Sequence, residues 1–135
     1  MTIEYFKRSK EEIDLAFSIL KVLNDANASL FIKHLMKSMA FITDFAVNKH
    51  ADFANDLPII KKRLDLLFGA DFLETYFYLD SLLKREFKVF DMSNITMSGR
   101  NVENVTSEFF RQLSNKVVNF FNTAYDLTLD GKIWT

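Results

Sequence analysis

The chain has 135 residues, 49% of them hydrophobic and 26% charged, and its formal net charge is −1. This composition is typical of a globular protein, and the length predicts one domain over residues 1–135. Because there is no cysteine, disulfides and thiolate catalysis are excluded, and the small net charge excludes a strong overall field for nucleic acids.

The beginning of the sequence, MTIEYFKRSK, is charged and has no apolar run before a cleavage site, so we expect no signal peptide and a cytoplasmic protein. No uncharged apolar stretch approaches roughly 18 residues, so no membrane partner is expected. Three glycines and one proline are too few turn residues for a β-rich fold. Helices are therefore expected throughout.

Hydrophobic periodicity predicts the first two helices at about 2–25 and 29–49, separated by the turn-forming stretch NDANAS. A third helix is predicted at 57–68. An acid and a following proline suit its first turn, so Asp56 marks its start, and Gly69 marks its end.

The remaining periodic segments predict a fourth helix at about 71–90 and a fifth at about 102–129. Between them, residues 91–101 (DMSNITMSGRN) have no helical period and are predicted to form a loop. The sequence therefore predicts an all-α fold, an up-and-down antiparallel helical bundle of about five helices.

Few residues suit catalysis or metal binding. His34 and His50 have no second ligand at helical spacing, so neither a metal nor a cofactor is expected. We expect His34 to be a partly buried helix residue and His50 to be a cation at a helix end. Glu11 and Glu12 are expected on an exposed face, paired with nearby basic residues. No residue is assigned a catalytic role.

One basic stretch, LLKREFKVFDMSN, suits two interpretations. Lys84, Arg85 and Lys88 stand among apolar residues and are followed by Asp91, as at the edge of an RNA-binding site. Acids such as Asp80 interrupt the positive charge, however, so a solvated helix face is the favoured interpretation. Any RNA affinity is expected to be weak and steeply dependent on salt.

Four segments carry a resemblance to a known family. YFKRSKEEIDLAFSIL resembles the opening helix of HEPN domains, and ASLFIKHLMKSMAFITDFAVNKH resembles their second long helix. YLDSLLKREFKVFDMSN and NVTSEFFRQLSNKVVNFFNTAYDL resemble their later part, in which a helix with an arginine and a break precede a long closing helix. The resemblance implies a helical bundle that commonly dimerises. Many members are metal-independent ribonucleases of toxin–antitoxin or defence systems, often paired with a small nucleotidyltransferase.

The catalytic signature of the family is an arginine followed, after four to six residues, by a histidine. Arg85 stands in the expected place but is followed at those positions by Phe90, Asp91 and Met92, and no other arginine has such a histidine. An ionised carboxylate is a poor substitute for an imidazole that both accepts and donates a proton near neutral pH.

The favoured interpretation is a non-catalytic HEPN-like protein that acts through protein–protein interaction, in a toxin–antitoxin or defence-type two-gene module with a nucleotidyltransferase-like partner. Two alternatives stay open. One is a ribonuclease or RNA-binding protein with an atypical site formed by Lys84, Arg85, Lys88 and Asp91. The other is a structural helical protein unrelated to HEPN domains.

A surplus of apolar residues predicts a homodimer. The first, second and fifth predicted helices carry more apolar residues than one buried stripe needs. The second has Phe41 on its polar side, and the fifth adds a second row beside its main one: Phe110, Val118, Phe121 and Tyr125. Because exposing large apolar side chains is unfavourable, we expect the first two helices or the fifth to form a two-fold contact.

Overall fold

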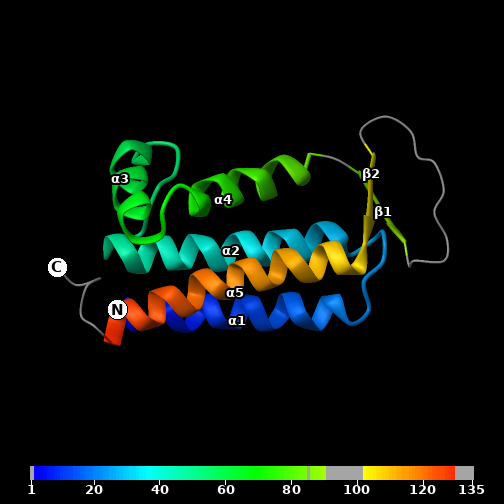
Figure 1. Ribbon diagram of the computed structural model, residues 1–135, viewed down its shortest axis with the longest axis horizontal. Coiled ribbons are helices and arrows are strands. Elements are labelled where there is room, and N and C mark those ends of the chain that lie inside the picture. Colours follow the sequence, from blue (N-terminus) through cyan, green and yellow to red (C-terminus); the bar gives the residue numbers. More distant parts are fainter. Residues whose placement is uncertain (1, 85, 91–101, 130–135) are drawn as a thin grey trace.

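The computed structural model describes residues 2–84, 86–90 and 102–129. The helices are α1 (Thr2–Leu20), α2 (Ala28–Val47), α3 (Leu57–Phe68), α4 (Asp71–Leu82) and α5 (Ser107–Leu129). The helices α1, α2, α4 and α5 lie along the long axis with alternating direction, and α3 lies across this axis at one end (Figure 1). This arrangement confirms the predicted all-α, up-and-down bundle.

The central helix is α2, which contacts each of the other four helices. Its apolar residues recur on several faces, so it is buried on more than one side. It ends where Asn48 adopts a left-handed conformation, with φ of 59° and ψ of 33°, which asparagine tolerates better than most residues. Its fully buried large side chains are Phe31, Ile32, Leu35, Met39, Ile42 and Phe45.

Helix boundaries follow local hydrogen bonding. The third helix has the predicted bounds, and Gly69 ends it with φ of 75° and an N–H that donates to the Asp65 carbonyl. The first helix ends at Leu20 and not near residue 25. Beyond it, Asn24 Oδ1 accepts the N–H of Ala26 (2.8 Å) and that of the next residue, so a side-chain turn replaces the helix.

Two short strands correct the predicted bounds of the fourth and fifth helices. Strands β1 (Glu86–Phe90) and β2 (Val102–Thr106) pair in parallel, with Glu86 opposite Val102 and Phe90 opposite Thr106. They lie at one end of the bundle, where α4 ends and α5 begins (Figure 1). Residues 102–106 include two valines and a threonine, which favour extended backbone. The predicted loop, 91–101, lies outside the described residues.

All five helices contribute to a single apolar cluster. Aromatic rings join the helices in pairs: Phe31 of α2 meets Phe110 of α5 edge-on with ring centroids 5.2 Å apart, and Phe72 of α4 lies 4.9 Å from Phe120 of α5. Such pairs add to the burial energy of the rings. A buried hydroxyl pair, Ser9 and Ser38 with oxygens 2.8 Å apart, ties α1 to α2.

Most of the apolar surplus of α5 is buried within the chain, which weakens the argument for a dimer through this helix. Phe110 is fully buried, and Val118 and Phe121 pack against the core. Phe6 of α1 stacks on Phe121 with ring centroids 4.3 Å apart, so α1 covers the second row. Tyr125 alone in that row stays exposed, at 49%.

Candidate functional site

Of the four residues predicted to form a basic edge, the structure describes the side chain of Lys84 alone. The side chain of Lys84 is 77% exposed, and its Nζ lies 3.8 Å from Asp80 Oδ2. An exposed pair of this kind contributes little to stability. Arg85, Asp91 and the side chain of Lys88 lie outside the described residues. Lys84 therefore lies exposed in the turn just after α4.

The two histidines both contact carboxylates. His34 Nδ1 lies 2.5 Å from Glu12 Oε2, and both side chains are largely buried between α2 and α1. The prediction that His34 is a partly buried helix residue is confirmed, whereas the expected exposure of Glu12 is wrong because it turns toward this imidazole. His50 is exposed, and its Nδ1 lies 3.4 Å from Asp44 Oδ2. The first contact links α1 to α2, and the second links the end of α2 to the loop that follows it.

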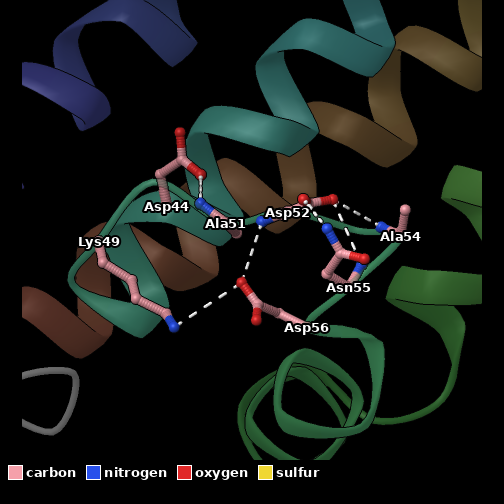
Figure 2. Close-up of polar contacts among 7 residues, drawn as sticks. All are labelled: Asp44, Lys49, Ala51, Asp52, Ala54, Asn55 and Asp56. Atoms are coloured by element: carbon pink, nitrogen blue, oxygen red, sulfur yellow. Dashed lines mark hydrogen bonds and ion pairs between the residues drawn. The ribbon is translucent and has the colours of Figure 1, made fainter.

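The loop between α2 and α3 is held by three carboxylates (Figure 2). The nearly buried Asp44 accepts the N–H of Ala51 at 2.7 Å. Burial raises the pKa of Asp44, although the Ala51 N–H and His50 oppose this shift. Asp52 and Asp56 lie further along the loop, and Asp56 Oδ2 accepts the N–H of Asp52 at 3.4 Å.

Asp52 shows the opposite pKa behaviour. Its Oδ1 accepts the backbone N–H groups of Ala54 (2.9 Å) and Asn55 (3.3 Å), and its Oδ2 accepts the Asn55 side-chain N–H at 2.7 Å (Figure 2). These bonds, the Ala54 bond first, lower the pKa of Asp52. Because the oxygens of this loop are used by its own backbone, we assign it a structural role.

Two hollows lie on either side of Glu74 in α4, and the sequence analysis did not anticipate them. The α4–α5 hollow has a volume of about 240 Å³ and is lined by Asp71, Glu74, Thr75, Tyr78, Leu113 and Lys116. The α3–α4 hollow has about 280 Å³ and is lined by Leu57, Lys61, Asp65, Ala70, Leu73, Glu74 and Phe77. The first is mainly polar in its side chains, and the second is mainly apolar.

Each hollow has a lining residue with an unsatisfied polar atom. Within residues 2–84, 86–90 and 102–129, the buried side-chain oxygens without a hydrogen-bond partner are Thr75 Oγ1 and Asp65 Oδ1. The other oxygen of Asp65 is bonded to Lys61 Nζ. Lys116 Nζ lies 3.0 Å from Asp71 Oδ1 and so links α5 to α4 across the first hollow. The spacing of Asp71, Thr75 and Tyr78 along one helix face was a signal in the sequence that periodicity analysis for the core overlooks.

Comparisons with known proteins find no relative. No family model matches the sequence, and no curated protein or solved structure is significantly similar to it. The resemblance to HEPN domains therefore stays a prediction from the sequence. In the part of the chain that the structure describes, no group of three His, Asp or Glu side chains is placed to hold a metal ion. No described helix is both long and apolar enough to cross a membrane.

Proposed function

We propose that the protein acts through contact with another protein chain, as a HEPN-like helical protein without the Arg-x4-6-His ribonuclease motif, and that its partner is a second copy of itself. The observation that carries this proposal is a set of exposed apolar side chains, two on one face of α3 and one on α4. Ile59 is 60% exposed, Leu66 is 76% exposed and Phe77 is 45% exposed. We call these three residues the α3–α4 surface.

The geometry of α3 places its two exposed apolar residues together. Ile59 and Leu66 are two helical turns apart and so share one face, opposite the buried Ile60 and Leu64. Single exposed apolar residues are normal on a monomer, whereas Ile59 and Leu66 together form an apolar strip along one helix face, of the kind that protein contacts bury. Burying each of these side chains would stabilise a complex by roughly 1.5–3 kcal/mol before the costs of association.

The charges beside this surface favour a second copy as the partner. The basic residues of α3 outnumber its one acid, whereas α4 has acids and no basic residue. In a two-fold contact, α3 of each copy can lie against α4 of the other, so opposite charges meet twice. Lys61, Asp71 and Asp80 already form ion pairs within the chain, so the charges concerned are Lys62 on α3 and Glu74 on α4.

The HEPN resemblance adds a second partner to this proposal, a nucleotidyltransferase-like protein of a two-gene module. A dimer through α3 and α4 would leave α1 and the outer side of α5 free for it. This differs from the contact expected from the sequence, because α1 and α5 bury much of their apolar surplus against each other.

Sedimentation of the 15.8 kDa chain tests the proposed dimer. We expect the wild type to sediment at about twice the monomer mass at low micromolar concentration, and the double variant Ile59→Gln, Leu66→Gln to sediment as a monomer. The matched control replaces Leu15 and Leu30, each 47% exposed on other helices, by glutamine and should remain dimeric. A wild type that is monomeric, or a dimer that survives the α3 double variant, contradicts the proposal.

A further inference from the structure

The α4–α5 hollow presents polar groups from two helices toward one space. Four of its residues are spaced i, i+3, i+4 and i+7, which places them on one face of α4. The other two come from the facing side of α5. In chain order the six are Asp71, Glu74, Thr75, Tyr78, Leu113 and Lys116.

The charge of the hollow is negative, and one carboxylate supplies it. Lys116 and Asp71 form an ion pair, with Nζ and Oδ1 3.0 Å apart, and so largely neutralise each other. Glu74 has no ion pair or hydrogen bond through its side chain with any residue that the structure describes. The hollow therefore attracts a positively charged group, and Glu74 is the carboxylate available to pair with it.

The other lining groups suit a nitrogen cation. Tyr78 is 45% exposed, and a cation over its ring is attracted by the negatively charged face of the ring. Thr75 is 4% exposed and its hydroxyl has no partner, so its oxygen can accept a hydrogen bond from an N–H donor. Leu113 adds an apolar wall for the carbon atoms attached to the nitrogen. A carboxylate, an aromatic ring and an unsatisfied hydroxyl together match an ammonium or guanidinium group.

The size of the hollow limits what it can hold. Its volume of about 240 Å³ is below the roughly 300–1,000 Å³ of pockets for drug-sized ligands. It suits a single short alkyl chain that ends in a charged nitrogen. We propose that the α4–α5 hollow binds a primary ammonium or guanidinium group, presented either by a small free amine or by a lysine or arginine side chain of a polypeptide. The hollow contains none of the three apolar residues of the α3–α4 surface, but Glu74 also faces α3 of the second copy in the proposed dimer.

Heteronuclear NMR titration of the full chain tests this site. One probe is n-butylammonium chloride, and the other is the capped tripeptide acetyl-Gly-Lys-Gly-amide, each compared with sodium chloride and sodium acetate at equal ionic strength. We expect saturable shifts at Glu74, Thr75 and Lys116 with both amines and none with the sodium salts. Stronger binding of the tripeptide identifies a polypeptide side chain as the source of the cation, and stronger or equal binding of n-butylammonium identifies a free amine.

Variants assign the shifts to the hollow. Glu74→Gln should weaken amine binding about fivefold, as expected for the loss of one exposed ion pair. Tyr78→Leu should weaken it by a similar factor through the loss of the ring. Glu11→Gln, an equally conservative change at an exposed carboxylate of α1, should leave binding unchanged.

The same titration in the Ile59→Gln, Leu66→Gln background separates this site from the dimer. We expect amine affinity at least as high there, because Glu74 is then not paired with α3 of a second copy, and a monomeric wild type would leave the result intact. The proposal is overturned if the shifts do not saturate, if acetate produces the same shifts, or if Glu74→Gln binds as the wild type does.

Discussion

Replacing Thr75 by valine should stabilise the protein. Thr75 is only 4% exposed, and its hydroxyl has no hydrogen-bond partner in the part of the chain that the structure describes. Leaving a buried hydroxyl unsatisfied costs about 1–3 kcal/mol, and valine has nearly the same shape without that oxygen. Valine and threonine also have similar helix propensities, so the helical backbone contributes little to the difference. We therefore expect the free energy of unfolding to rise by about 1–3 kcal/mol.

A second threonine provides a matched control for this substitution. Thr43 in α2 is fully buried, but its hydroxyl donates to the Met39 carbonyl at 2.9 Å. Thr43→Val removes this hydrogen bond and should lower the free energy of unfolding by about 0.5–1.5 kcal/mol. The changes produced by the two variants should thus have opposite signs and differ by roughly 1.5–4.5 kcal/mol.

Urea unfolding followed by far-ultraviolet circular dichroism measures both variants. If the m-value is unchanged, a higher midpoint for Thr75→Val and a lower one for Thr43→Val give the predicted signs. Equal destabilisation by the two variants would refute the reasoning, since the Thr75 hydroxyl would then have a partner in the folded protein.

Three further predictions concern pH and RNA. Because the pKa of Asp44 is raised above its usual 3.8, its stabilising contribution is fully present below that pH and is lost as pH rises through the folded pKa. Urea unfolding at a series of pH values should show wild-type stability falling relative to Asp44→Asn across this window, and parallel curves would contradict it. The protein should also leave a labelled structured RNA intact in EDTA, and cleavage that disappears in Arg85→Ala would contradict this. Any RNA binding should be lost by roughly 0.3 M salt, and binding that persists there would indicate a recognition site.

Local sequence signals predicted helix bounds well where residues typical of helix starts and ends occur. The third helix has its predicted bounds: the Asp56 carbonyl accepts the N–H groups of Ile59 and Ile60, although its side chain does not cap the helix, and Gly69 ends it. The first helix was predicted too long because the asparagine turn after Leu20 competes with the helix through side-chain bonds that periodicity does not register. The strands were missed for a related reason: Phe87 and Phe90 keep the helical spacing of α4, so short apolar runs fit both structures.

Contacts between residues far apart in the sequence could not be predicted from local sequence patterns. The contact between His34 and Glu12 joins residues 22 positions apart, and rules for neighbours on one helix cannot detect it. The α4–α5 hollow likewise could not be predicted, because it forms where α5 packs against α4 and brings Lys116 to Asp71. The apolar second row of α5 was interpreted as a dimer face because the sequence does not show that Phe6 covers Phe121.

The contact between α3 of one copy and α4 of the other is the central claim, and a paramagnetic label tests it most directly. Since the chain has no cysteine, Ala54→Cys provides a single attachment site in the exposed loop before α3, outside the α3–α4 surface. Labelled protein is mixed with isotope-enriched, unlabelled protein, and broadening is measured in the enriched copy. We predict broadening of Glu74 and Phe77 on α4 of that copy. Absence of intermolecular broadening, or broadening confined to α1 and α5, would contradict the proposed contact.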